Sequence, residues 1–254
     1  MIKNYRFITI LLMAMFLCPA LMASGQQTTK KDLQNNIEGY LNGLLTLTAD
    51  FVQLNPDHTV VPGRLWLKRS LSLKEWGKLR LDYDCQKIVT RGDELVLYAP
   101  NTENQKAGQM TEESSYPLDS TPAAFILSKK ISFTKDLHVK EITGTPNNAY
   151  AKIILERPND TSGMSLTLVF SLYPLTGKVK KIEHWVVLDA QGNETVVIFI
   201  PDTVKGGDAN RIADTIFKPP FPGQKPFDAQ ELIPSELSPW LNDRLRQDMP
   251  NKIK

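Results

Sequence analysis

The stretch that decides the fold is Gly63-Arg64-Leu65-Trp66-Leu67-Lys68-Arg69. Its leucines point to one side of an extended chain, whereas Arg64 and Lys68 point to the other. The same period of two returns in residues 78–84 and in residues 163–173. In the last stretch one side carries only apolar residues, namely Met164, Leu166, Leu168, Phe170 and Leu172. This alternation predicts strands with one buried and one solvent-facing side.

Outward from these stretches, the chain reads as short strands joined by tight turns. Further strands are predicted from residue 46 onward and around residues 86–91, 94–100, 131–142, 150–157, 178–189 and 193–200. Gly92-Asp93, Thr176-Gly177 and Gln191-Gly192-Asn193 are predicted hairpin turns. Because no crossover helices separate the strands, the predicted fold class is mainly β (α+β), an antiparallel meander with one apolar face.

Two helices are predicted beside the strands. The first has an apolar stripe at helical spacing, and residues 29–32 resemble a capping box at its start. The stripe consists of Leu33, Ile37, Tyr40, Leu41 and Leu44. Residues 101–116 are polar and loop-like, and the second helix follows at residues 117–127, with Thr121 as its N-cap. Pro122 is its first helical residue. This apolar helix has to cover something, and the open apolar face of the sheet is the candidate.

The N-terminal segment, residues 1–25, is predicted to be a secretory signal peptide. Lys3 and Arg6 precede an apolar core that ends before Pro19, and small residues follow. The core is shorter than the ~20 residues that a membrane-spanning helix needs. Cys18 raises the alternative of a lipid-modified N-terminus, although a leucine stands before it where such processing needs a small residue. We therefore expect a periplasmic protein.

Composition indicates one domain followed by a tail. The 254 residues are 41% hydrophobic, which suffices for a core, and the net charge of +2 argues against nucleic acid as a partner. The domain is predicted to span residues 26–222, and a Pro-rich extension is predicted to span residues 223–254. After removal of the signal peptide only Cys85 remains, so no internal disulfide is expected.

The sequence shows none of the patterns typical of catalysis, cofactor binding or metal binding. The three histidines stand alone, and there is no phosphate-binding glycine loop, nucleophile elbow or dinucleotide fingerprint. Asp82 and Asp84 share one face of a predicted strand, where surface acids are favoured over an acid–base pair. His184 shares the parity of Ile182 and Val186 and is interpreted as a core histidine. No enzyme activity, cofactor or metal is expected.

Arg69 breaks the pattern of its strand because it lies on the side of the leucines. One interpretation is an arginine at a strand end whose head group reaches water. The other is a guanidinium that holds a mobile element over the apolar face, because its five donors suit several backbone carbonyls at once. Such charge-assisted hydrogen bonds contribute only ~1.5–3 kcal/mol each, so an entering ligand can displace them.

Five stretches together resemble the LolA family, the periplasmic carriers of outer-membrane lipoproteins. They are residues 44–53, 63–69, 79–83, 88–98 and 116–122, and the resemblance covers roughly residues 30–220. It implies an unclosed antiparallel β-barrel whose apolar concave face is covered by short helices. It also implies that Arg69, in a pair similar to the family's Lys-Arg-Pro motif, is the gate that bonds lid carbonyls. Ser70 departs from the proline of that motif, and residues 71–76 resemble an insertion.

The resemblance implies a monomeric carrier that binds the acyl chains of lipoproteins in a hydrophobic cavity. The implied partners are acylated lipoproteins, the inner-membrane ABC-type lipoprotein-release complex and the outer-membrane lipoprotein acceptor. The predicted lid and gate residues are Arg69, Pro122, Phe125 and Ile126. The predicted cavity-lining residues are Leu47, Phe51, Leu65, Leu67, Leu79, Leu81, Leu166, Leu168 and Phe170. Three alternatives stay open: a membrane-anchored lipoprotein acceptor of similar fold, an envelope enzyme acting on lipids or glycans, and an envelope-interaction protein that uses the Pro-rich extension.

Overall fold

A computed structural model describes most of the predicted domain. The described residues are 29–70, 75–100, 110–128, 130–135, 137–144, 149–159, 161–207 and 212–219. The predictions for the signal peptide and the Pro-rich extension lie outside these residues, as does most of the predicted insertion. None of the described helices is long and apolar enough to cross a membrane.

The described residues form mainly strands, with a few short helices. The strands are β1 (Thr46–Leu54), β2 (Val60–Lys68), β3 (Lys78–Asp82), β4 (Lys87–Arg91), β5 (Glu94–Pro100), β6 (Met110–Pro117), β7 (His138–Gly144), β8 (Tyr150–Glu156), β9 (Ser165–Leu172), β10 (Val179–Leu188), β11 (Glu194–Phe199) and β12 (Lys205–Gly206). The helical elements are α2 (Lys30–Gly43), η1 (Leu118–Ser120), α3 (Ala124–Leu127), η3 (Pro201–Thr203) and η4 (Asp214–Phe217).

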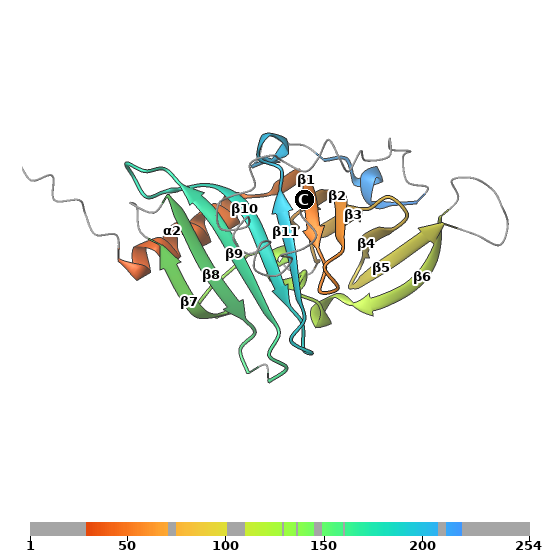
Figure 1. Ribbon diagram of the computed structural model, residues 1–254, viewed down its shortest axis with the longest axis horizontal. Helices are drawn as coiled ribbons and strands as arrows, with labels where there is room; N and C mark the ends of the chain where they lie inside the picture. The colour runs from red at the N-terminus through yellow and green to blue at the C-terminus, as the bar shows by residue number, and fades with distance from the viewer. Residues whose placement is uncertain are drawn as a thin grey trace, which may run out of the picture.

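Within the described residues the strands make one antiparallel sheet of twelve strands (Figure 1). Its order is β6-β5-β4-β3-β2-β1-β11-β10-β9-β8-β7, and β12 pairs with β1. Two meanders therefore meet in the middle of the sheet, where Phe51 of β1 lies opposite Phe199 of β11. The edges β6 and β7 do not pair with each other. The predicted unclosed antiparallel sheet is confirmed.

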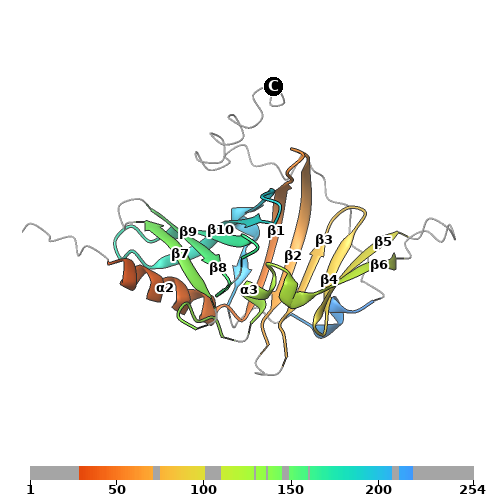
Figure 2. The same ribbon diagram turned by 90° about the horizontal axis from the view of Figure 1, so that it is seen from below.

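The chain between β6 and β7 has to cross the sheet because these strands are its opposite edges. The described part of this crossing segment, residues 118–128, 130–135 and 137, carries η1 and α3 and lies on the same side of the sheet as α2 (Figure 2). Asn42 of α2 fastens the two together, since its Nδ2 donates to Ile131 O and its Oδ1 accepts from Ile131 N, both at 2.9 Å. We call the covered face, which carries Leu65 and Phe51, the concave face.

Most of the core lies between the concave face and its two covering helices. Leu33, Ile37 and Leu41 of the predicted stripe are buried there together with side chains of the strands and of the crossing segment. The predicted capping box is confirmed at the start of α2, where the Thr29 hydroxyl accepts from Asp32 N at 3.1 Å. The opposite, convex face carries a smaller cluster: Trp66, Val89, Val96, Tyr98, Ile212 and Phe217.

Two strand predictions are wrong, both at the edges of the sheet. Residues 101–116 were expected to be loop-like, yet β6 begins at Met110. No side chain of this strand is fully buried, so no apolar alternation marks it in the sequence. At the other edge β7 begins at His138 rather than near residue 131. Ile131 is buried because of its bonds to α2, not because it belongs to a strand.

The predicted helix at residues 117–127 is divided into η1 and α3, and its predicted N-cap is wrong. The Thr121 hydroxyl donates back to Leu118 O at 2.8 Å, and α3 begins after Ala123. Thr121 therefore ends η1 instead of capping α3. Pro122 lies in the turn between the two, where its carbonyl accepts from Phe125 N at 3.1 Å.

Candidate functional site

The predicted lining residues lie together on the concave face. Leu81 packs against the main cluster as a partly buried residue, and each of the others is at most 3% exposed. Those others are Leu47, Phe51, Leu65, Leu67, Leu79, Leu166, Leu168 and Phe170. Of the predicted lid residues, Phe125 and Ile126 are buried in the same cluster, and Pro122 is partly exposed. The geometry thus provides a continuous apolar face beneath α2 and α3.

The cover is complete over one half of the sheet and incomplete over the other. On β8 and β9, Ile153 and Leu168 are fully buried. On β4 and β5 the register pairs Ile88 with Leu97 on the concave face, and both are only partly buried. Tyr116 of β6 continues this face and is 56% exposed. An apolar surface therefore extends from beneath the helices towards β6.

Arg69 joins both covering helices to the end of β2. Its Nη1 donates to Leu41 O at 2.6 Å near the end of α2. Its Nη2 and Nε donate to Ser128 O, directly after α3, at 2.7 and 3.1 Å. Both acceptors lie at helix ends, and Leu41 O also accepts from the amide of the C-cap residue Leu44 at 3.3 Å. Arg69 is 5% exposed, so its head group does not reach water, and burial lowers its pKa.

Gly77 holds α3 beside Arg69. Its amide donates to Leu127 O at 3.0 Å. A Cβ at this position would lie 2.9 Å from Leu127 O and 2.9 Å from Lys68 O, so a larger residue would push α3 away from β2. Trp76 next to it packs against the main cluster. The described end of the predicted insertion thus supports α3.

Arg157, which the sequence reasoning missed, holds α3 from the other half of the sheet. It follows β8, and its Nη2 donates to Thr121 O at 3.2 Å. Its guanidinium carbon lies 5.5 Å from the centre of the Phe125 ring, within the range of a cation–π interaction. An arginine at a strand end carries no sequence signal that separates this role from a surface position. Arg69 and Arg157 therefore fasten α3 at two places.

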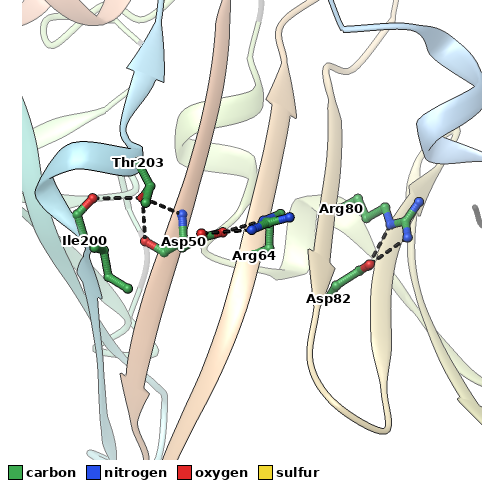
Figure 3. A network of polar contacts seen from close by, with 6 residues as sticks. All are labelled: Asp50, Arg64, Arg80, Asp82, Ile200 and Thr203. Atoms are coloured by element: carbon green, nitrogen blue, oxygen red, sulfur yellow. Dashed lines mark hydrogen bonds and ion pairs between the residues drawn. The ribbon is translucent and has the colours of Figure 1, made fainter. Parts of the chain in front are cut away.

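The convex face is held by a buried ion pair (Figure 3). Arg80 Nε and Nη2 lie 2.6 Å from the two carboxylate oxygens of Asp82, and Lys87 Nζ adds a contact at 2.9 Å. The Arg80 and Asp82 side chains are 0% and 1% exposed. Arg80 also donates to Ile216 O at 2.7 Å and lies 5.0 Å from the Trp66 ring centre. Arg80 thereby anchors residues 212–219, which we call the C-terminal strap.

A second polar contact on the same face fastens the chain after β11 (Figure 3). Arg64 pairs with Asp50 through two hydrogen bonds between neighbouring strands. The Asp50 amide donates to the Thr203 hydroxyl at 2.8 Å, and that hydroxyl donates to Ile200 O at 2.8 Å. The Asp50 backbone thus holds the segment that follows β11, while the Asp50 side chain pairs with Arg64.

The predicted surface pair of carboxylates is wrong. β3 ends at Asp82, so Asp84 lies outside the strand and is exposed, and Asp82 is buried against Arg80. These two carboxylates therefore do not share a strand face. Within the described residues, no group of three or more His, Cys, Asp and Glu side chains is placed to hold a metal ion.

His184 is buried, as interpreted, but the parity argument behind that interpretation is wrong. The pairing of β10 with β9 shifts between Ile182 and His184. As a result Ile182 packs in the main cluster, whereas Val186 packs with Leu54 and Val196 in a separate one. A single irregularity thus turns the following side chains to the other face.

A cavity of about 850 Å³ lies beside the C-terminal strap rather than beneath α2 and α3. Its apolar walls include Val89, Tyr98 and Phe217. Its charged lining is balanced between three cations and three carboxylates: Lys78, Arg91 and Lys218 with Glu75, Asp93 and Asp214. This balance favours no charged ligand class.

Comparisons with known proteins bear on the chain as a whole. Residues 42–218 match the model of a family described as outer membrane lipoprotein carrier protein LolA. No curated protein shows a significant match to the chain.

Solved structures with a similar fold come from several bacteria. One is a domain from Vibrio parahaemolyticus described as an outer membrane lipoprotein-sorting protein, with 13% identity and a TM-score of 0.41 over 74% of this chain and 97% of that chain. Another is a DUF1329 family protein from Desulfovibrio piger, with 11% identity and a TM-score of 0.40 over 76% and 98% of the two chains. A third is a LolA superfamily protein from Nitrosomonas europaea, with 13% identity and a TM-score of 0.35 over 75% and 97%.

Proposed function

The chain belongs to the LolA family, and from this premise we propose that it carries acylated lipoproteins through the periplasm. It takes them from the inner-membrane ABC-type release complex and passes them to the outer-membrane acceptor. The acyl chains bind between the concave face and the covering helices α2 and α3. The protein works as a monomer and catalyses no reaction, and residues 1–25 direct its export.

The observation that carries this proposal is the way Arg69 holds both helices over an apolar face. Three hydrogen bonds join its guanidinium to the carbonyls of Leu41 and Ser128. Charge-assisted bonds of this kind contribute ~1.5–3 kcal/mol each. Burying acyl chains contributes ~0.8 kcal/mol per methylene, so about ten methylenes offset all three bonds. An acyl ligand therefore shifts the protein from the closed to the open arrangement.

The incomplete cover over β4 to β6 supports an entry route on that side. Ile88 and Leu97 continue the concave face and are only partly buried. An acyl chain can bind to this surface first. It then has favourable contacts before the hydrogen bonds that Arg69 and Arg157 make next to α3 are broken. The closed arrangement then protects the core in the absence of a ligand.

A direct test measures binding of a fluorescent triacylated lipopeptide to the purified protein. We expect saturable binding of the lipopeptide and none of the same peptide without acyl chains. Absence of lipopeptide binding would contradict the carrier function.

The gate is tested separately with Arg69→Leu, which we expect to impair loading and release of lipoproteins from spheroplasts. Arg91→Leu, an exposed arginine of the same sheet, is the matched control. Normal release of lipoproteins with Arg69→Leu would contradict the proposed gate role of Arg69.

The alternatives predict different results. Mass spectrometry of the mature N-terminus separates a cleaved carrier from a membrane-anchored acceptor lipidated at Cys18. An enzyme that uses Asp84 or His184 is eliminated if alanine at both positions leaves lipoprotein transport intact. An interaction role for the extension loses support if deletion of residues 223–254 has no phenotype.

A further inference from the structure

The hairpin between β9 and β10 carries an exposed apolar tip. Leu175 at the turn is 100% exposed, Tyr173 before it is 50% exposed, and Tyr150 on the neighbouring strand is 46% exposed. Tyr150 lies opposite Ser171, two residues from Tyr173, so both tyrosines are on the same face. These three account for most of the large exposed hydrophobic side chains among the described residues. Such a gathering marks an interaction site rather than ordinary surface.

The tip is rigid, which matters because a rigid apolar tip loses little entropy on binding. Tyr173 N donates to Lys178 O at 2.9 Å, and Gly177 N donates to Tyr173 O at 2.8 Å. Pro174 restricts its own φ, and Gly177 adopts a φ of +63° that disfavours other residues. Turn positions are usually polar. The leucine is therefore presented to solvent by a fixed turn.

Two lysines follow the tip directly in the chain, and two more lie at the start of α2. Lys178 and Lys180 are exposed and take part in none of the ion pairs found among the described residues. Lys30 and Lys31 begin α2, whose N-terminal end lies at the same end of the molecule as this hairpin (Figures 1 and 2). Asp32 is the acidic residue in that first turn of α2. The end of the molecule that presents the apolar tip is thus predominantly basic.

We propose that this hairpin tip docks on the surface of an anionic lipid bilayer. Leu175 enters the boundary between head groups and acyl chains, Tyr150 and Tyr173 lie at the head-group level, and the lysines meet lipid phosphates. A protein partner fits less well, because stable protein interfaces bury about 800 Å² on each side and are depleted of lysine. A narrow apolar tip with lysines at the same end of the molecule suits shallow insertion into lipid.

The tip is tied to the helix that covers the concave face. Asn36 Nδ2 donates to Gly177 O at 2.9 Å, and Asn36 Oδ1 accepts from Val179 N at 3.3 Å. Docking of the tip consequently holds α2 close to the lipid surface. This docking does not depend on the proposed carrier function, because it uses none of the residues of the concave face.

Flotation of the purified mature protein with lipid vesicles tests this proposal. We expect binding to vesicles of phosphatidylglycerol and phosphatidylethanolamine, and weaker binding to phosphatidylcholine alone. Leu175→Asp should lower the partition coefficient by on the order of tenfold. The matched control is Val60→Asp, because Val60 is 45% exposed at a different hairpin and should leave binding unchanged. Circular dichroism confirms that each variant is folded.

Three results would overturn the docking proposal. They are no binding of the wild-type protein to the anionic vesicles, equal binding by wild-type and Leu175→Asp proteins, and an equal loss with Val60→Asp. Binding that appears only on membranes containing proteins would assign the tip to a protein partner instead. Lipopeptide binding is measured on the same preparations without vesicles, so failure of the carrier function is recognised separately from failure of docking.

Discussion

Two buried arginines on opposite faces of the sheet are bonded in different ways. Arg69 on the concave side donates to backbone carbonyls of the covering helices. Arg80 on the convex side is matched by the carboxylate of Asp82 and donates to the C-terminal strap. A carbonyl at a helix end can accept from water once the helix moves, whereas a buried carboxylate has no such substitute. Under the proposed carrier function, the concave face is the one that opens and the convex face stays closed.

The largest expected effect comes from breaking the convex ion pair. Asp82→Ala leaves Arg80 and Lys87 without their carboxylate, and removing one partner of a buried pair costs ~3–5 kcal/mol. We expect a free energy of unfolding in urea that is lower by this amount. Arg91→Ala removes an exposed pair with Glu112 and should change the unfolding free energy little. Similar losses of unfolding free energy in the two variants would show that the buried pair of Arg80 and Asp82 stabilises the protein no more than an exposed ion pair does.

The same comparison shows what the sequence can predict. Alternating leucines predict the strands of the concave face because the signal is local and one face of each strand is covered. Arg80 and Asp82 alternate with leucines in the same way and look solvent-facing. They are buried because the strap, 136 residues later in the chain, lies over them. No local pattern reports such a cover.

In the candidate site, too, the sequence predicts what a local pattern reports and misses what a distant segment determines. Arg69 was placed on the apolar side by parity alone, and its bonds to Leu41 and Ser128 are present in the structure. Arg157 was missed because its partners, Thr121 and Phe125, are brought to it by the crossing segment. Parity holds along a strand that has no irregularity, but it carries no information about which distant segment will cover that strand.

A smaller effect is expected from loosening α3 on the concave side. Arg157→Gln removes the bond to Thr121 O and the contact with the Phe125 ring. A charge-assisted bond contributes ~1.5–3 kcal/mol, so hydrogen exchange of α3 amides should accelerate by roughly 10- to 150-fold. Amides of β9 should keep their protection. Arg69→Gln should give the same pattern, because both arginines hold α3.

If Arg157→Gln destabilised the whole sheet, the claim that the concave side can loosen without the rest of the fold would be contradicted. In that case the exchange of β9 amides would accelerate together with that of α3. Unchanged exchange of α3 would show instead that Arg157 does not hold it. Arg91→Gln serves as the control, since this side chain is bonded to Glu94 and Glu112 away from α3.

The smallest effect concerns the pH dependence of the strap. Lys68 and Lys78 contact the Asp214 carboxylate at 2.8 and 2.9 Å, and their hydrogen bonds lower its pKa from 3.8 to about 2. Because the folded pKa of Asp214 lies below the unfolded one, its contribution to stability is complete above pH ~4 and is lost as the pH falls through 2.

The variant Asp214→Asn should therefore be less stable than wild type at pH 6, with a smaller stability difference at pH 3. The difference is modest because the Asp214 side chain is 53% exposed. A stability difference that stays constant between pH 6 and pH 3 would show that the two lysines do not stabilise the strap through this carboxylate.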